Sequence, residues 1–255
     1  MRTRARGTWI FPAVLVVVAL AGVLAQRAVD PVGLWVFLLV LGGWVITLCL
    51  HEFAHAAVAL AGGDTSVRAR GYLTLNPLRY TDIANSLVIP VILLAIGGIP
   101  LPGGAVLVEP HRLRHRWWAS VVSAAGPATN LLAGAVLTWA SVQLSSPAGV
   151  GGGVVTPLAA ALAFLGLLQF VAAILNLLPV PGFDGWGILA PYLPPVVAQR
   201  IRPIQPWVPL IVFALLWSLP ALSRALFDAA DRLLALFGGS GLLAAVGQNL
   251  FFFWR

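Results

Sequence analysis

The sequence predicts an all-α integral membrane protein with about six transmembrane helices. Hydrophobic residues make up 60% of the 255 residues, charged residues make up only 9%, and the mean hydropathy is +0.96. A soluble domain of this length has too little interior to bury so large an apolar fraction. No shift in composition marks a separate soluble domain, so we expect residues 1–255 to form a single integral membrane domain.

The net charge of +7 comes entirely from arginine, because the chain contains no lysine. The arginines occur in short clusters between apolar runs, which is typical of the cytoplasmic loops of membrane proteins. This pattern favours a lipid bilayer as the environment and excludes nucleic acid as the expected partner. Arginine without lysine, amid many alanines and glycines, is also typical of a GC-rich bacterial genome. The single Cys49 leaves no intrachain disulfide framework.

One polar motif interrupts the apolar run between residues 34 and 61. On a helix His51 and His55 are four residues apart and project from one face, so their imidazoles can share a metal ion. Glu52 follows the first histidine and is placed to act as a general base, as in the H-E-x-x-H motif of zinc peptidases. Three such polar groups inside a membrane helix are costly unless they face a ligand or a water-filled cavity.

The other apolar runs give the order of the helices. We expect crossings at residues 9–25 (a retained signal anchor), 32–61, 117–144, 156–178, 207–219 and, marginally, 242–254, with an amphipathic helix at 223–237 along the outer interface. Eleven arginines then lie on the inner side before the tail and three on the outer side. This asymmetry places the histidine pair near the cytoplasmic face.

Two further segments do not fit a simple crossing. Residues 67–75 have alternating character and are expected to form a short strand or hairpin in the loop after the H-E-x-x-H helix. Residues 87–101 are apolar but short, and proline and glycine interrupt them. Arginine clusters flank this second segment on both sides, so we expect a re-entrant or membrane-surface segment.

A catalytic zinc site usually has three protein ligands and one open position. His111 and His115 lie in a basic loop and are poor candidates for the third ligand. Asp184 follows a break at Pro179 and Pro181, where a helix arrives at the cytoplasmic side. Because that break lies at the same depth as the histidine pair, topology favours Asp184. The alternative is an ordinary turn residue in a Phe-Asp-Gly sequence.

With these motifs the chain resembles the site-2 proteases, zinc metalloproteases that cut within membranes. The resemblance rests on His51–His55, on the stretch 176–185 that ends in Asp184-Gly185, on Ala125-Gly126-Pro127-Ala128-Thr129-Asn130, and on the loop 73–78. It covers about residues 34–193 and points to the compact prokaryotic branch without PDZ or CBS domains. It implies a catalytic core at 34–193 and C-terminal helices at 194–255.

The resemblance also implies the roles of the residues. His51, His55 and Asp184 would hold one zinc ion per chain, and Glu52 would activate water. Asn130 would hydrogen-bond the substrate backbone or the developing oxyanion, although a polar contact in helix packing is the simpler interpretation. The implied function is regulated intramembrane proteolysis at the bacterial inner membrane. Its substrate would be a single-pass membrane protein such as an anti-sigma factor.

Two other functions compete with this interpretation. A zinc-binding membrane transporter or sensor could use the same histidine pair, but the other spans contain almost no ionisable residues for a transport path. A membrane peptidase of the type that trims prenylated proteins would take a glutamate from a later helix as third ligand. The chain has only one other glutamate, Glu109, and it lies in a loop.

Overall fold

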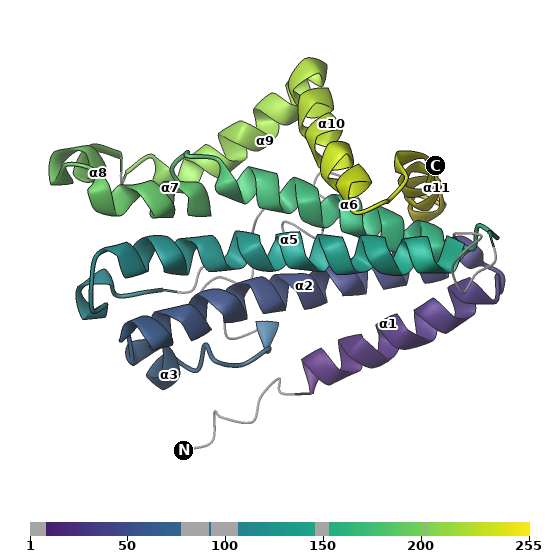
Figure 1. Ribbon diagram of the computed structural model, residues 1–255, viewed down its shortest axis with the longest axis horizontal. Helices are drawn as coiled ribbons and strands as arrows, with labels where there is room; N and C mark the ends of the chain where they lie inside the picture. The colour runs from purple at the N-terminus through teal and green to yellow at the C-terminus, as the bar shows by residue number, and fades with distance from the viewer. Residues whose placement is uncertain (1–8, 78–91, 93–106, 146–152, 202) are drawn as a thin grey trace. The chain divides into compact units, whose positions relative to one another are not determined.

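The computed structural model describes residues 9–77, 92, 107–145, 153–201 and 203–255, and within these ranges the chain is helical with no strand (Figure 1). The first half contains α1 (Ile10–Gln26), α2 (Val32–Gly62), α3 (Ser66–Arg70), the short 3-10 helix η3 (Pro110–Arg112) and α5 (Trp117–Ser145). The second half contains α6 (Pro157–Leu177), α7 (Asp184–Leu189), η4 (Ala190–Tyr192), α8 (Pro195–Ile201), η5 (Gln205–Trp207), α9 (Val208–Ser218), α10 (Pro220–Leu236) and α11 (Gly241–Phe251).

Local chemistry explains several of these helix boundaries. Helix α6 begins at Pro157, whose fixed φ suits the first helical position, and the Thr156 hydroxyl accepts a hydrogen bond from the Ala159 N–H. Helix α2 ends at Gly62, and the next residue, Gly63, has a φ of +114°, which a residue with a Cβ rarely adopts. The ends of the long helices are therefore encoded in the residues beside them.

Three described helices, α2, α5 and α6, are long and apolar enough to cross a membrane. The number rises to five if the bent pairs α8 to α9 and α10 to α11 each count as one span. The protein is therefore a polytopic integral membrane protein. Helix α1 has only 17 residues, and α9 and α11 have 11 each, so the six predicted crossings are not all present as full-length helices.

The predicted strand at residues 67–75 is wrong within the described part of its loop. Residues Ser66–Arg70 form α3, which ends at Gly71 with a φ of +78°, and residues 72–76 are irregular. Alternation over so few residues does not distinguish a strand from one helical turn, and a left-handed glycine ends the helix. The re-entrant segment predicted at 87–101 lies outside the described residues, apart from Ile92.

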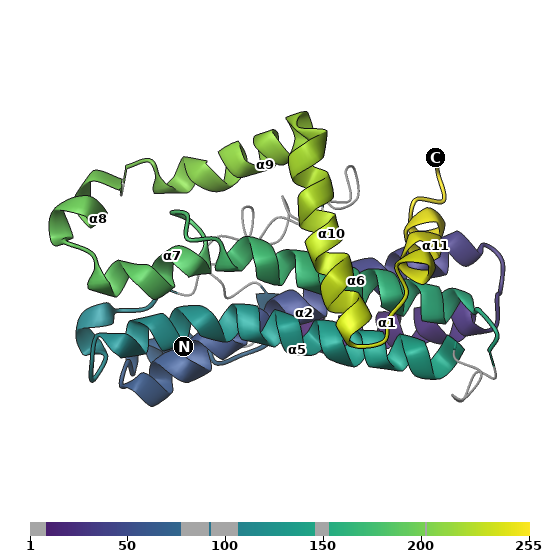
Figure 2. The same ribbon diagram turned by 45° about the horizontal axis from the view of Figure 1, so that its top comes forward.

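The chain forms two compact units. The first comprises Met1–Thr47, Leu131–Phe170 and Asp228–Arg255. Within it the second half of α5 lies side by side with the first part of α6 (Figure 2). Gly134 lies against the Phe170 ring, and the Ser141 hydroxyl donates a 2.8 Å hydrogen bond to the Ala159 carbonyl. Small residues and such interhelical hydrogen bonds are how helices associate in a membrane, where burial alone gives no advantage.

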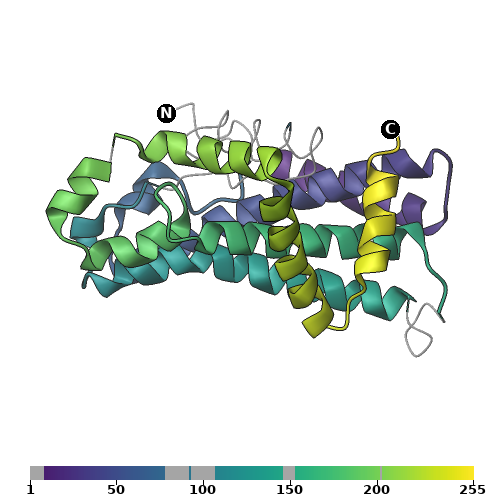
Figure 3. The same cartoon turned by 90° about the horizontal axis from the view of Figure 1, so that it is seen from above.

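The C-terminal helices end the same unit. The path bends by 119° between α10 and α11 (Figure 3), and the Ser240 hydroxyl caps α11 by accepting a hydrogen bond from the Leu243 N–H. Gly247 lies directly against the Ala160 carbonyl of α6. Helix α10 is the amphipathic helix predicted at 223–237. The marginal crossing predicted at 242–254 is instead the 11-residue α11 followed by a short turn.

The second unit comprises Leu48–Asn130 and Val171–Phe227 and contains every predicted site residue. Its core joins the end of α2 to the start of α5 through buried apolar side chains. They are Ala56, Ala59, Val67, Tyr72, Leu113 and Val122. This packing brings the H-E-x-x-H turn of α2 against α5.

Candidate metal centre

The two histidines of the motif lie on one face of α2, as their spacing predicts. His51 and His55 are 6% and 7% exposed, and their Nε2 atoms are 3.1 Å apart. Buried imidazole nitrogens at this separation need a shared proton or a cation between them, because two lone pairs facing each other repel.

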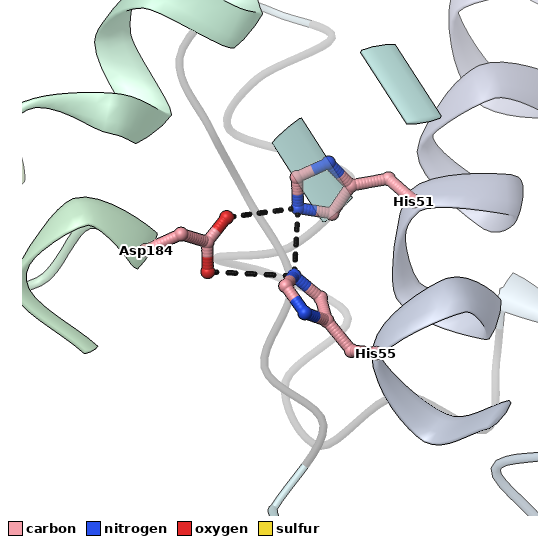
Figure 4. A group of neighbouring side chains, drawn as sticks. All are labelled: His51, His55 and Asp184. Carbon is pink, nitrogen blue, oxygen red and sulfur yellow. Dashed lines mark hydrogen bonds and ion pairs between the residues drawn. The ribbon is translucent and has the colours of Figure 1, made fainter. Parts of the chain in front are cut away.

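Asp184, the first residue of α7, lies opposite this pair (Figure 4). Its Oδ2 is 3.2 Å from Nε2 of His51 and its Oδ1 is 3.4 Å from Nε2 of His55. One ligand atom from each of the three residues lies within 4.8 Å of the others. The carboxylate and the histidine pair, separated by about 130 residues in the sequence, therefore converge on one point.

Hydrogen bonds on the far side of each ring determine its tautomer. Nδ1 of His55 is 2.6 Å from the Val122 carbonyl oxygen, which can only accept, so this nitrogen carries the proton. Nδ1 of His51 is 2.5 Å from the Asn130 amide oxygen, which accepts in the same way. With Nδ1 as the donor, the neutral form of each ring has its lone pair on Nε2, the form that binds a metal.

The donor set fits a zinc ion. Ligand atoms bound tetrahedrally at about 2.0–2.1 Å lie roughly 3.3 Å from one another. Here the two Nε2 atoms are 3.1 Å apart, and each lies 3.2 or 3.4 Å from a different oxygen of the Asp184 carboxylate. The buried Oδ2 of Asp184 has no hydrogen-bond donor in the part of the chain that the structure describes. Two lone-pair nitrogens and a carboxylate facing one another without a donor have the charge and the spacing of a cation site.

Helix α5 closes one side of this centre through a glycine. A Cβ built on Gly126 would overlap Nε2 of both His51 and His55. Only a residue without a side chain lets α5 approach the imidazoles so closely. The next residue, Pro127, lies inside the helix and cannot donate to the carbonyl four residues earlier. Gly126 thus leaves the space that the ligand atoms occupy.

Two more glycines position Asp184. A Cβ on Gly185 would overlap the carbonyl oxygens of Leu177 and Leu178 at the end of α6, and a Cβ on Gly187 would overlap the Ser123 hydroxyl of α5. The α7 backbone can therefore lie close to both long helices. One turn earlier on α5 the Ser120 hydroxyl donates a 2.7 Å hydrogen bond to the Ile188 carbonyl. These contacts hold the carboxylate toward the histidines.

The centre opens into a cavity of about 660 Å³. Glu52, 2% exposed, lines this cavity together with His51, His55 and Asp184. The carboxylate predicted to act as base therefore shares a chamber with the candidate ligands. Asn130 is also buried, and it lies behind His51 rather than on the cavity wall.

The segment 107–112 forms another wall of the cavity and is held by a charged network. The Asp64 carboxylate, fully buried, accepts hydrogen bonds from the backbone N–H groups of Ser66 (2.9 Å) and Glu109 (2.8 Å). Glu109 in turn pairs with Arg70 and Arg112. Burial acts to raise the pKa of Asp64, but these N–H donors outweigh it and lower its pKa below the usual value.

The structure brings His51, His55, Asp184 and Glu52 to one cavity, and Asn130 to His51. His111 and His115, the poor candidates, lie apart from this group: His111 is 3.4 Å from Glu109, and His115 stacks on Trp117. Sequence reasoning missed the contacts of Val122 and Ser120. Val122 acts through its backbone carbonyl, which the sequence does not mark. Ser120 is a lone serine on an apolar helix, which is only a weak signal in the sequence.

The fold and the site define a class of protein: an integral membrane protein with a His-His-Asp metal centre and a glutamate beside it, the arrangement of a metal-dependent hydrolase. No protein-family model matches the chain, and no solved structure matches it. The chain is 42% identical to a protein of Mycolicibacterium smegmatis assigned as the zinc metalloprotease Rip2, over all of this chain and 96% of the relative.

Two other relatives are also assigned as zinc metalloproteases. The protein assigned as Rip2 in Mycobacterium tuberculosis is 39% identical over 99% of this chain and 96% of its own length. The protein assigned as the zinc metalloprotease YwhC in Bacillus subtilis is 28% identical over 76% of this chain and 88% of its own length. The chain belongs to the site-2 protease family and is an intramembrane zinc metalloprotease. The relatives thus favour the protease over the transporter.

Proposed function

We propose that His51, His55 and Asp184 bind one zinc ion per chain and that Glu52 is the general base for peptide-bond hydrolysis. The observation that carries this proposal is the convergence of two imidazole Nε2 atoms and a carboxylate at 3.1–3.4 Å. The burial of Glu52 in the same cavity supports its role, because a carboxylate in a chamber that holds water is suited to proton transfer.

A zinc ion held by His51, His55 and Asp184 would supply Lewis acidity, which lowers the pKa of bound water toward about 7 and polarises a carbonyl. Glu52 accepts a proton from the attacking water and later delivers it to the leaving amine. The Asn130 amide oxygen accepts a hydrogen bond from the His51 Nδ1–H and keeps the opposite nitrogen available to a metal. An additional contact of Asn130 with the substrate backbone or the oxyanion stays part of the proposal.

The substrate class follows from the chemistry of a membrane helix. Its carbonyl groups are occupied by intrahelical hydrogen bonds, so the scissile segment must unwind before attack. A frayed helix end near the membrane surface satisfies this demand and admits water. We therefore propose transmembrane segments of membrane proteins as the substrates. The resemblance to site-2 proteases narrows this proposal to single-pass membrane proteins, such as anti-sigma factors, in regulated intramembrane proteolysis.

The orientation in the membrane rests on charge. Arginines cluster in the segments that follow α2 and precede α5, beside the metal centre; they include Arg68, Arg70, Arg112, Arg114 and Arg116. Arginine-rich short loops remain on the cytoplasmic side. The proposed location is the bacterial inner membrane, with the site near its cytoplasmic face.

The decisive variant is Glu52→Gln in the purified protein. It keeps the shape of the side chain and removes the base, so zinc content should stay at one per chain while cleavage falls by at least about 100-fold. Zinc is measured by mass spectrometry of the metal, and cleavage by the appearance of new peptide termini. Cleavage by Glu52→Gln at the wild-type rate would overturn the role of Glu52.

Two histidine variants, one inside the centre and one outside it, test the proposed metal ligands. His51→Gln should lose zinc, whereas His111→Gln should retain it because the His111 side chain is 74% exposed and apart from the centre. Retention of zinc by both variants would contradict the proposed ligands.

A further inference from the structure

The cavity continues away from the metal centre along a seam between α5 and α7. Three contacts follow this seam: Gly187 lies against Ser123, the Ile188 carbonyl accepts from Ser120, and Tyr192 contacts Arg116. Residue numbers fall along α5 as they rise along α7 and η4, so the two elements run antiparallel. Both contribute to the cavity wall. We call this part of the cavity the α5–α7 trough; Asp184 lies at its inner end and Arg116 at its outer end.

Among the described residues, Arg116 is the only arginine that lines the cavity. Its guanidinium carbon lies 5.3 Å from the centroid of the Tyr192 ring, within the range of a cation–π contact. None of the ion pairs within the described residues includes Arg116, whereas Arg70 and Arg112 both pair with Glu109. Arg116 therefore brings a positive charge to the cavity that no described acidic side chain neutralises.

The helix rise gives the scale of the trough. Six residues separate Arg116 from Val122, whose carbonyl contacts His55, and at about 1.5 Å per residue this is roughly 9 Å along the helix axis. An extended peptide covers about 3.3 Å per residue, so this length corresponds to roughly three substrate residues. The reach of the arginine side chain extends the range to about five residues from the scissile bond.

We propose that Arg116 is a specificity-determining residue that binds an acidic side chain of the peptide substrate within about five residues of the cleaved bond. The cation–π contact with the Tyr192 ring restrains the guanidinium. This inference rests on the proposed function and adds a substrate class to it: segments with an aspartate or glutamate close to the scissile bond. A lipid phosphate is the competing anion, but Arg116 shares one cavity with the metal centre, which favours the peptide.

The test uses a library of peptides from a bacterial membrane fraction, in detergent with the zinc-loaded full-length protein. Mass spectrometry identifies the cleaved bonds. We expect one position within about five residues of the cleaved bond to carry the preference. The wild type should cleave peptides with Asp or Glu at that position about fivefold more often than peptides with Asn or Gln at it. Fivefold corresponds to about 1 kcal/mol, the upper range for a partly exposed ion pair.

Three variants separate the interpretations. Arg116→Gln should lose the preference and still cleave neutral peptides, Arg116→Glu should prefer Lys or Arg at the same position, and Arg114→Gln should behave as the wild type. Arg114 is the matched control because it is exposed and does not line the cavity.

Each other outcome overturns the inference. Cleavage by the wild type without an acidic preference, or a preference that Arg116→Gln retains, removes Arg116 as the determinant. The assay is repeated in vesicles with and without phosphatidylglycerol. If Arg116→Gln then loses cleavage of all peptides equally, and only in vesicles that contain phosphatidylglycerol, Arg116 is assigned to lipid phosphate. If zinc-loaded wild type cleaves no peptide, the proposed function fails as well, and this result is distinct from cleavage without preference.

Discussion

The amide oxygen of Asn130 lies 2.5 Å from Nδ1 of His51, on the side of the ring opposite the candidate metal position. Asn130 comes from α5 and His51 from α2, so this contact joins two long helices at the metal centre. A second contact between the same helices, from Nδ1 of His55 to the Val122 carbonyl, does the same for the other ring. Both imidazoles are thus oriented from behind by α5.

Replacing Asn130 should therefore affect the metal before it affects the substrate. Asn130→Ala removes the acceptor, frees the tautomer of His51 and should weaken zinc binding roughly 10–100-fold. Asn130→Asp keeps an acceptor oxygen and should retain most of the affinity. Competition with a chromophoric chelator measures zinc affinity. Unchanged zinc affinity in Asn130→Ala with a large fall in kcat would instead support a contact of Asn130 with the substrate alone.

Gly126 gives a prediction about space. Gly126→Ala places a methyl group where the Nε2 atoms of both histidines lie, and an overpacking penalty of about 1–3 kcal/mol corresponds to about 5–150-fold weaker zinc binding. Gly22→Ala in α1 is the matched control, because its Cβ would meet neighbours only at 3.5 Å or more. Equal zinc affinity in both variants would show that α5 can withdraw from the centre.

The catalytic motif could be predicted from the sequence because its geometry is local. Four residues of helix bring His51 and His55 together whatever the rest of the chain does. Asp184 required a second argument, the depth at which two helices end, and the structure brings it to the pair. The roles of Val122 and Gly187 could not be predicted, because a backbone carbonyl has no residue type and a close approach of two helices depends on tertiary packing.

The fold could be predicted to a similar extent. The long apolar runs predict α2, α5 and α6, because a segment in lipid must satisfy its own backbone hydrogen bonds. The short elements were harder to predict. Residues 67–75 alternate between apolar and polar side chains as a strand would, yet Ser66–Arg70 form a helix that ends at Gly71. Helices α9 and α11 lie within one to three residues of the predicted runs at 207–219 and 242–254, but hydropathy does not locate the bends that join them to their neighbours.

Gly185 gives a prediction about the third ligand. In Gly185→Ala the new methyl group would overlap the carbonyl oxygens of Leu177 and Leu178, backbone atoms that cannot rotate away. Helix α7 must then move and take Asp184 with it. We expect zinc affinity and cleavage to fall together by about 10–100-fold.

Gly187→Ala is the informative comparison, because its methyl group meets mainly the Ser123 side chain. Adding Ser123→Gly to Gly187→Ala removes that obstacle and should restore zinc binding, which a chelator titration measures. Failure of the double variant to recover would mean that α7 is not positioned by this contact.

Asp64 gives a prediction about pH. Its pKa is lowered from the ordinary 3.8 in the folded protein, since N–H donors from Glu109 and Ser66 outweigh the effect of burial. A depressed pKa stabilises the fold above pH 3.8, and that stabilisation is lost as the pH falls through the folded-state pKa. The segment 107–112, which lines the cavity, should therefore loosen in acid.

Hydrogen exchange of the Glu109 amide should report this loosening, after correction for the intrinsic pH dependence of exchange. Asp64→Asn should show weak protection of this amide already at neutral pH, with no further loss in acid. The same acid-dependent loss in wild type and Asp64→Asn would exclude Asp64 as the group that holds this wall of the cavity.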